Sequence, residues 1–212
     1  MRWNSAFLDM AGPFEKAEGS FYYISPPDPS WPPAMQEAYI PYEGDLLATS
    51  IHEVYPGHFT QLLQYRRADS KVQKIFDSYA FVEGWAHYSE QMMLDEGFGK
   101  EAPRLRLGQL ANALLRNCRF LAAIGMHTKG MTVEEADTLF QKKCFIDPGN
   151  AIQQAYRGTF DPGFLSYTLG KLQILELRDE FFAKRGTKSL KAFHDWLLSY
   201  GGSPVQLIAR RL

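Results

Sequence analysis

The sequence predicts a mainly α-helical fold with a short extended segment near the N-terminus. From Asp45 onward, apolar residues recur at helical spacing and no strands alternate with the helices, which favours an α architecture over a parallel α/β sheet. Residues 1–49, in contrast, carry much of the proline, including Pro26-Pro27 and Pro32-Pro33, and are expected to be mostly irregular. At 212 residues, the chain can form one domain with a sizeable core, on which residues 1–49 would pack.

Residues 19–25 are the one strand candidate in the N-terminal segment, because this aromatic run is bounded by glycine and proline. Two interpretations are open: the strand pairs with the backbone of a substrate beside the active site, or it packs on the core.

Helices are expected beyond this segment, and glycine, proline and capping residues set their ends. Gly97 and Gly130 end two of them, Thr132 and Glu135 form a capping box that begins another, and Pro148-Gly149 is a turn. The expected helices cover residues 46–67, 70–96, 103–129, 132–143, 150–157, 165–183 and 189–200.

A zinc-peptidase-like motif lies in the first expected helix. In the usual H-E-x-x-H pattern, two histidines four residues apart share a helix face, and the glutamate beside them acts as general base. Here His52-Glu53 is followed by Pro56-Gly57-His58, so the histidines are six residues apart. Six residues correspond to about 240° on a regular helix. We therefore expect the Pro-Gly pair to break or bulge the helix and return both histidines to one side.

A catalytic zinc site needs three protein ligands, and Glu83 is the candidate for the third. It lies in an apolar, aromatic stretch, where a carboxylate is costly to bury unless it is paired or binds a metal. The alternative is structural: His58 caps a helix and Glu83 pairs with an arginine. His87 follows Glu83 by four residues, so it is either a fourth ligand, a group behind the ligands or unrelated to the site.

Four segments resemble the bacterial domain-of-unknown-function 885 family. They are the His52-Glu53-x-x-Pro-Gly-His58 motif, the Glu-Gly-Trp-Ala run that starts at Glu83, and the segments over 162–172 and 193–204. The chain looks like the C-terminal half of these proteins, from about Gly12 onward. The resemblance implies a largely helical, zincin-like metallopeptidase.

Further site residues follow from the resemblance. Tyr167 is retained in the family motif, and a tyrosine hydroxyl can stabilise the oxyanion of a tetrahedral intermediate. His127 and Arg119 match family positions, and either side chain could bind an oxyanion or a substrate carboxylate. For Arg119, a structural pairing is an equal alternative. The chain departs from the family at Phe59, where a histidine is common, and at Ala123, where an aspartate is common.

Composition narrows the class of protein. A net charge of −1 does not indicate binding to nucleic acid or to an anionic membrane surface. Neither a signal peptide nor an apolar run long enough to span a membrane is present, and this leaves the location open. Cys118 and Cys144 form no C-x-x-C pattern, so neither a disulfide framework nor a thiolate zinc site is expected.

The predicted function is a Zn2+-dependent hydrolase that cleaves a peptide or a small amide. His52, His58 and Glu83 would hold the metal, Glu53 would be the general base, and Tyr167 or His127 would stabilise the oxyanion. The alternatives are an inactive, metal-binding scaffold and a zinc hydrolase of non-peptide amides or esters. The ligand set also suits non-haem iron, although such oxygenases need no glutamate after the first histidine. We expect the chain to be part of a longer protein, so that its open site would be covered by a missing N-terminal region or by self-association.

Overall fold

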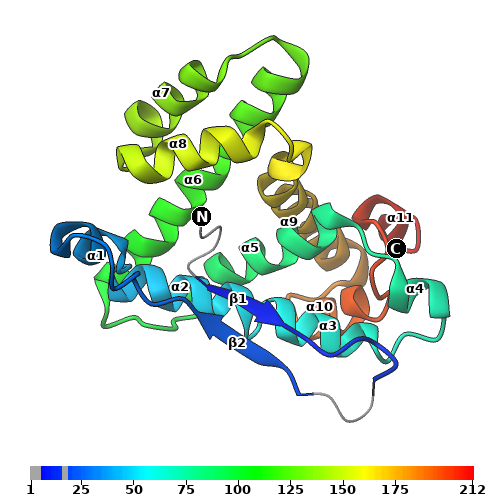
Figure 1. Cartoon of the computed structure of the whole chain (residues 1–212). Coiled ribbons are helices and arrows are strands. Elements are labelled where there is room, and N and C mark those ends of the chain that lie inside the picture. Colours follow the sequence, from blue (N-terminus) through cyan, green and yellow to red (C-terminus); the bar gives the residue numbers. More distant parts are fainter. Residues whose placement is uncertain (1–5, 16–18) are drawn as a thin grey trace.

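The computed structural model describes residues 6–15 and 19–212, and it is mainly helical with a two-stranded antiparallel sheet (Figure 1). The predicted fold class is therefore confirmed. Residues 1–5 and 16–18 of the proline-rich segment lie outside the described residues. The elements are β1 (Ala6–Asp9), β2 (Phe21–Ile24), α1 (Pro33–Tyr39), α2 (Glu43–Glu53), α3 (His58–Tyr65), α4 (Lys71–Ile75), α5 (Tyr79–Asp95), α6 (Pro103–Thr128), α7 (Val133–Cys144), α8 (Pro148–Gly158), the 3-10 turn η1 (Pro162–Leu165), α9 (Ser166–Arg185), α10 (Leu190–Leu198) and α11 (Val205–Ala209).

Local sequence explains where the later helices begin and end. Pro103 starts α6, where its missing N–H costs nothing, and Gly130 adopts a left-handed conformation after its end. The predicted capping box is present: Thr132 accepts a hydrogen bond from the backbone of Glu135, and the Glu135 carboxylate accepts one in return. Residues 103–129 and 132–143 are therefore helical very nearly as expected.

Two predicted helices are each divided in two. Residues 46–67 form α2 and α3, which are separated by the Pro-Gly turn, and residues 70–96 form α4 and α5. The second break occurs because the backbone at Ser78 and Gln73 pairs with Gly202 in the C-terminal loop, and Ser78 then caps α5. The helical periodicity of the sequence does not reveal a break that depends on such long-range pairing. The sequence analysis also did not predict α1, α11 or β1.

The hydrophobic core of the described residues consists of two clusters. One lies between α5, α9, α10 and α11 and is rich in aromatic rings, including Phe81, Trp85 and Phe193. The other lies between α6, α7, α8 and η1 and contains Phe140 and Phe164. Figure 1 shows α7 and α8 packed on one end of the long helix α6, while α5 and α9 lie beside its other part.

Glycine pairs let the helices of the site approach closely. A Cβ at Gly84 of α5 would overlap the backbone of Gly170 in α9, and one at Gly44 of α2 would overlap the backbone of α6 at Arg104. The helices that carry the predicted ligands are therefore held by direct backbone contact with α6 and α9, which fixes their separation.

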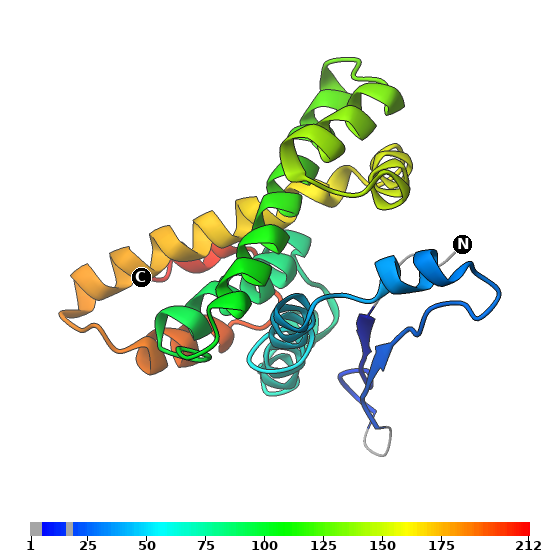
Figure 2. The same ribbon diagram turned by 90° about the vertical axis from the view of Figure 1, so that its left-hand side faces the viewer.

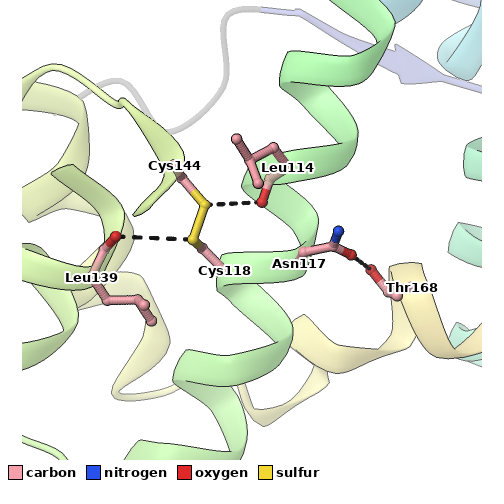
Figure 3. The surroundings of a disulfide bond; sticks show 6 residues. All are labelled: Leu114, Asn117, Cys118, Leu139, Cys144 and Thr168. Atoms are coloured by element: carbon pink, nitrogen blue, oxygen red, sulfur yellow. Dashed lines mark hydrogen bonds between the residues drawn. A yellow bond between two sulfur atoms is a disulfide. The ribbon is translucent and has the colours of Figure 1, made fainter. Parts of the chain in front are cut away.

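Cys118 of α6 and Cys144 of α7 form a disulfide, with Cα atoms 6.4 Å apart (Figure 3). This bridge was not expected from the spacing of the two cysteines in the sequence. They are 26 residues apart, and they meet only because α7 folds back along α6. The Sγ atom of Cys144 also lies 2.9 Å from the carbonyl oxygen of Leu114. The bridge thus fixes the C-terminal end of α7 to the middle of α6.

The N-terminal segment lies to one side of the helical body and contacts α2 (Figure 2). Its strands pair with Ala6 opposite Ile24 and Asp9 opposite Phe21. Several large apolar side chains of this segment are exposed, among them Phe21 and Tyr42. Much of this surface has no packing partner within the described chain. Across residues 6–15 and 19–212, none of the helices combines the length and the hydropathy that a membrane-spanning segment requires.

Candidate metal centre

The Pro-Gly turn brings the two motif histidines together. His52 lies in the last turn of α2 and His58 is the first residue of α3. The Gly57 N–H donates to the Ile51 carbonyl at 3.0 Å, which closes the turn, and a Cβ at Gly57 would overlap that carbonyl. The centroids of the two imidazole rings are 4.6 Å apart, and the ring planes are nearly perpendicular. The break thus absorbs the two inserted residues, as the sequence indicates.

Trp85 holds this turn in place from α5. Its indole Nε1–H donates to the carbonyl of Pro56 at 2.9 Å and lies 3.3 Å from that of Gly57. The Trp85 side chain is almost fully buried, so its indole N–H needs such a partner. The Glu-Gly-Trp run therefore contributes both a predicted ligand and the group that orients the histidine turn.

Glu83 completes a three-residue cluster with the histidines. Its Oε2 atom lies 3.3 Å from His52 Nε2 and 3.5 Å from His58 Nε2. One ligand atom from each residue lies within 4.8 Å of the others. Tetrahedral zinc with bonds of about 2.0–2.1 Å has ligand–ligand separations of about 3.4 Å. The two measured separations agree with that geometry.

The electrostatics of the cluster fit a site that holds positive charge. Burial would raise the pKa of Glu83, but the imidazoles of His52 and His58 outweigh it and hold this pKa well below its usual range. Burial and the charge of Arg116 would lower the pKa of His52, but Glu83 and Glu90 raise it to about 9. The Glu83 Oε2 atom has no hydrogen bond of good geometry from the described residues. The neighbours of this ionised oxygen are the two imidazole Nε2 atoms, with which it would share a metal.

Glu90 and Arg116 form a layer behind the cluster that the sequence analysis did not identify. His52 Nδ1 donates to Glu90 Oε1 at 2.7 Å. Arg116 forms an ion pair with Glu90 at 2.8 Å and donates a hydrogen bond to its Oε2 atom at 3.0 Å. A carboxylate on Nδ1 fixes the tautomer that leaves Nε2 free to bind a metal. The available indication was spacing, since Glu90 follows Glu83 by seven residues and shares its helix face.

His87 faces this second layer. Its Nδ1 lies 3.5 Å from Glu90 Oε2, and burial lowers its pKa to about 4. It is not part of the cluster of three possible ligands in the described chain. Of the roles open in the sequence, its position favours one behind the ligands.

Glu53, the predicted general base, is the last residue of α2 and contacts the N-terminal hairpin. Its Oε2 accepts a hydrogen bond from the Leu8 N–H of β1 at 3.2 Å. Tyr22 of β2 also reaches α2, where its hydroxyl lies 3.2 Å from Ser50 Oγ. The expected strand is thus present over Phe21–Ile24, but its partner β1 is the strand bonded to Glu53. Pairing of either strand with a substrate stays a prediction.

Tyr167 lies beside the cluster. Its ring is stacked on His52 with centroids 6.3 Å apart, and its hydroxyl is 3.4 Å from that of Tyr79. Burial and the negative charge of Glu83 raise its pKa, so the hydroxyl keeps its proton and can donate. This position is compatible with the predicted oxyanion role.

His127 lies away from the cluster. Its Nε2 donates to the Gly158 carbonyl at 2.8 Å, which links the ends of α6 and α8. It follows Arg119 by eight residues, about 12 Å along the helix, and it is Arg119 that contacts Tyr167, with Cζ 5.3 Å from the ring centroid. The structure therefore brings His52, His58 and Glu83 together with Tyr167 beside them, whereas the Glu53 carboxylate contacts β1 and His127 is not brought to the cluster.

Comparisons with known proteins agree with the sequence resemblance. The model of the family described as bacterial protein of unknown function (DUF885) matches residues 1–212, so the chain belongs to this family. The match covers the whole chain rather than starting near Gly12. No curated protein matches the sequence.

Two solved structures share the fold. One is a putative lipoprotein of unknown function from Shewanella oneidensis, with 33% identity and a TM-score of 0.87 over 100% of this chain. The other is a putative lipoprotein from Colwellia psychrerythraea, with 28% identity and a TM-score of 0.85 over 98% of the chain. This chain spans 39% and 34% of those two chains, respectively.

Proposed function

We propose that this chain carries the metal centre of a zinc-dependent hydrolase that cleaves peptide or amide bonds. The observation that carries the proposal is the convergence of His52, His58 and Glu83, with Glu53 directly after the first histidine. Two imidazoles and one carboxylate form a common ligand set of catalytic zinc, which leaves a fourth position for water.

The chain's own groups suit hydrolysis. Zinc, when bound, would lower the pKa of a water molecule and polarise the scissile carbonyl. Glu53 would take a proton from the attacking water and pass it to the leaving amine; the Leu8 N–H would hold one of its oxygens in place. The Tyr167 hydroxyl would donate to the developing oxyanion. Glu90 would keep the His52 ring in the ligating tautomer.

Metal content is the first test, because it separates this proposal from a structural ion-pair cluster. The purified chain should contain about one zinc, and Glu83→Gln should lose most of it. Glu53→Gln should retain the zinc but lose turnover, since Glu53 is not a ligand. Glu176→Gln, an exposed change on α9, serves as the control. Full zinc content in Glu83→Gln would remove this residue from the site, and iron in place of zinc would favour the oxygenase alternative.

The substrate is the second test. A peptide-library digest read by mass spectrometry, with and without added zinc, should show cleavage that Glu53→Gln abolishes. Metal binding without cleavage of peptides, amides or esters would favour the inactive scaffold. Cleavage of esters alone would favour the non-peptide hydrolase.

We also propose that the protein acts outside the cytoplasm. The Cys118–Cys144 disulfide suits an oxidising compartment, and both structural neighbours are described as putative lipoproteins. The exposed apolar side chains of the N-terminal hairpin would be covered by further chain or by a second copy. Sedimentation of this chain beside a longer one distinguishes these two coverings.

A further inference from the structure

Arg119 is a half-buried cation without an acidic partner in the described chain. Its Nε–H donates to the neutral Gln154 Oε1 of α8 at 2.9 Å. The neighbouring arginines differ: Arg116 pairs with Glu90, and Arg157 pairs with Asp161 at 3.0 Å. Within residues 6–15 and 19–212, no ion pair of Arg119 is found. A guanidinium withdrawn from water without a counter-charge is costly, so an anionic ligand would stabilise it.

Aromatic rings fix this guanidinium beside the metal centre. Its Cζ lies 5.3 Å from the Tyr167 centroid and 5.1 Å from that of Phe164. Tyr167 in turn stacks on His52 with centroids 6.3 Å apart, so Arg119 Cζ lies within about 12 Å of the His52 ring. At about 3.4 Å per residue, this distance corresponds to about three residues of extended chain or fewer.

A second arginine, Arg157, lies against the same aromatic ring, although its own charge is paired with Asp161. The Cζ of Arg157 lies 5.0 Å from Phe164, the same ring that Arg119 contacts. Burial lowers the pKa of Arg119, and the charges of Arg157 and Arg116 act in the same direction, against Tyr167 and the negative charge of Glu83, which raise it. Arginine nevertheless stays charged in proteins and binds carboxylates with two parallel hydrogen bonds.

We propose that Arg119 binds a carboxylate of the substrate within a few residues of the scissile bond. This inference rests on the proposed hydrolase and specifies its substrate class as short, anionic peptides. The carboxylate is either the C-terminal one or an acidic side chain, and both present the same group to the guanidinium.

Binding can be measured without turnover in the zinc-loaded Glu53→Gln protein. The probes are N-acetyl-tetra-alanine as the free acid and as the amide, and N-acetyl-Ala-Glu-Ala-Ala amide. We expect an anionic probe to bind about 10- to 100-fold more tightly than the neutral amide, as for a charge-assisted hydrogen bond. Preference for the free acid identifies the C-terminal carboxylate, and preference for the glutamyl peptide identifies a side chain.

Substitutions then assign the preference to this residue. In the same background, Arg119→Gln should abolish it, Arg119→Lys should restore part of it, and zinc content should not change. Arg104→Gln, an exposed arginine on the same helix, is the matched control. Equal binding of all three probes, or a preference that survives Arg119→Gln, would overturn the proposal.

The outcomes also separate this inference from the proposed function. Carboxylate preference lost in Arg119→Gln, in a protein that cleaves nothing, would support the subsite and refute the hydrolase. Cleavage of acid and amide peptides at equal rates, unchanged by Arg119→Gln, would support the hydrolase and refute the subsite.

Discussion

Replacing Glu90 by glutamine tests whether the second layer tunes the metal centre. The Glu90 carboxylate is fully buried, accepts hydrogen bonds from His52 at 2.7 Å and from Arg116 at 3.0 Å, and forms an ion pair with Arg116 at 2.8 Å. Glutamine has nearly the same volume but no charge, and its NH2 group cannot accept from either donor. Loss of such a partner of a ligating histidine typically weakens metal affinity 10- to 100-fold, or about 1.4–2.7 kcal/mol.

The same change leaves Arg116 as a buried, unpaired charge. Breaking a buried ion pair in this way costs about 3–5 kcal/mol of folding free energy. The lower end is expected, because the glutamine carbonyl can still accept one hydrogen bond from Arg116. Zinc affinity is measured by competition with a chelator, and the free energy of unfolding by urea titration of the metal-free protein.

A double variant separates these two effects. Adding Arg116→Met to Glu90→Gln removes the unpaired charge, so stability should partly recover while zinc affinity stays low. If the folded single variant binds zinc within about threefold of the wild type, the orienting role of Glu90 is refuted. If the double variant regains both stability and zinc affinity, Glu90 acts only through the fold.

Three further predictions concern the scaffold. Breaking the Cys118–Cys144 disulfide with Cys144→Ser should lower the free energy of unfolding by up to about 3.5 kcal/mol, from closure of its 26-residue loop; unchanged urea unfolding under oxidising conditions would contradict this. Burial lowers the pKa of His194 to about 4. The unfolded chain therefore takes up a proton on His194 at a higher pH than the folded protein does. As pH falls from 6.5 to 4, the free energy of unfolding should drop by at most about 3 kcal/mol, and His194→Gln should remove this drop. Gly84→Ala should lower the free energy of unfolding by about 1–3 kcal/mol, because its Cβ forces α5 away from α9. Gly149→Ala, where no backbone lies close, should not lower it. Equal melting temperatures of the two variants would refute the packing argument.

Local patterns in the sequence were sufficient for most of the fold. Helical periodicity and capping residues predict α6 to α10, because these signals lie within each helix. The helix break before Ser78 depends on its contact with Gly202, and the disulfide depends on the packing of α7 on α6. These segments meet only in the folded structure. No local period reports such pairings.

The same distinction applies to the site. His52, His58 and Glu83 could be proposed because the motif has a known chemistry at a characteristic spacing. Glu90 and Arg116 were missed because a buried acid and a buried arginine look like surface residues until their helices are placed together. His127 was predicted from a family position, yet its helix carries it about 16 Å along the axis from Arg116.

From the arrangement of charges, we expect the fold to be stable without a bound metal. The buried acids Glu83 and Glu90 are balanced by Arg116 and by the proton on His52, whose pKa is raised to about 9 chiefly by contacts with the two acids, against the opposing effects of burial and Arg116. Both hydrophobic clusters lie outside the predicted ligands. A chelator should therefore remove the metal while the far-UV circular dichroism spectrum stays helical. The melting temperature should fall only as far as the loss of the metal's binding free energy accounts for. Cooperative loss of helix on chelation would show instead that the metal is structural, because a chain that depends on structural zinc does not stay folded without it.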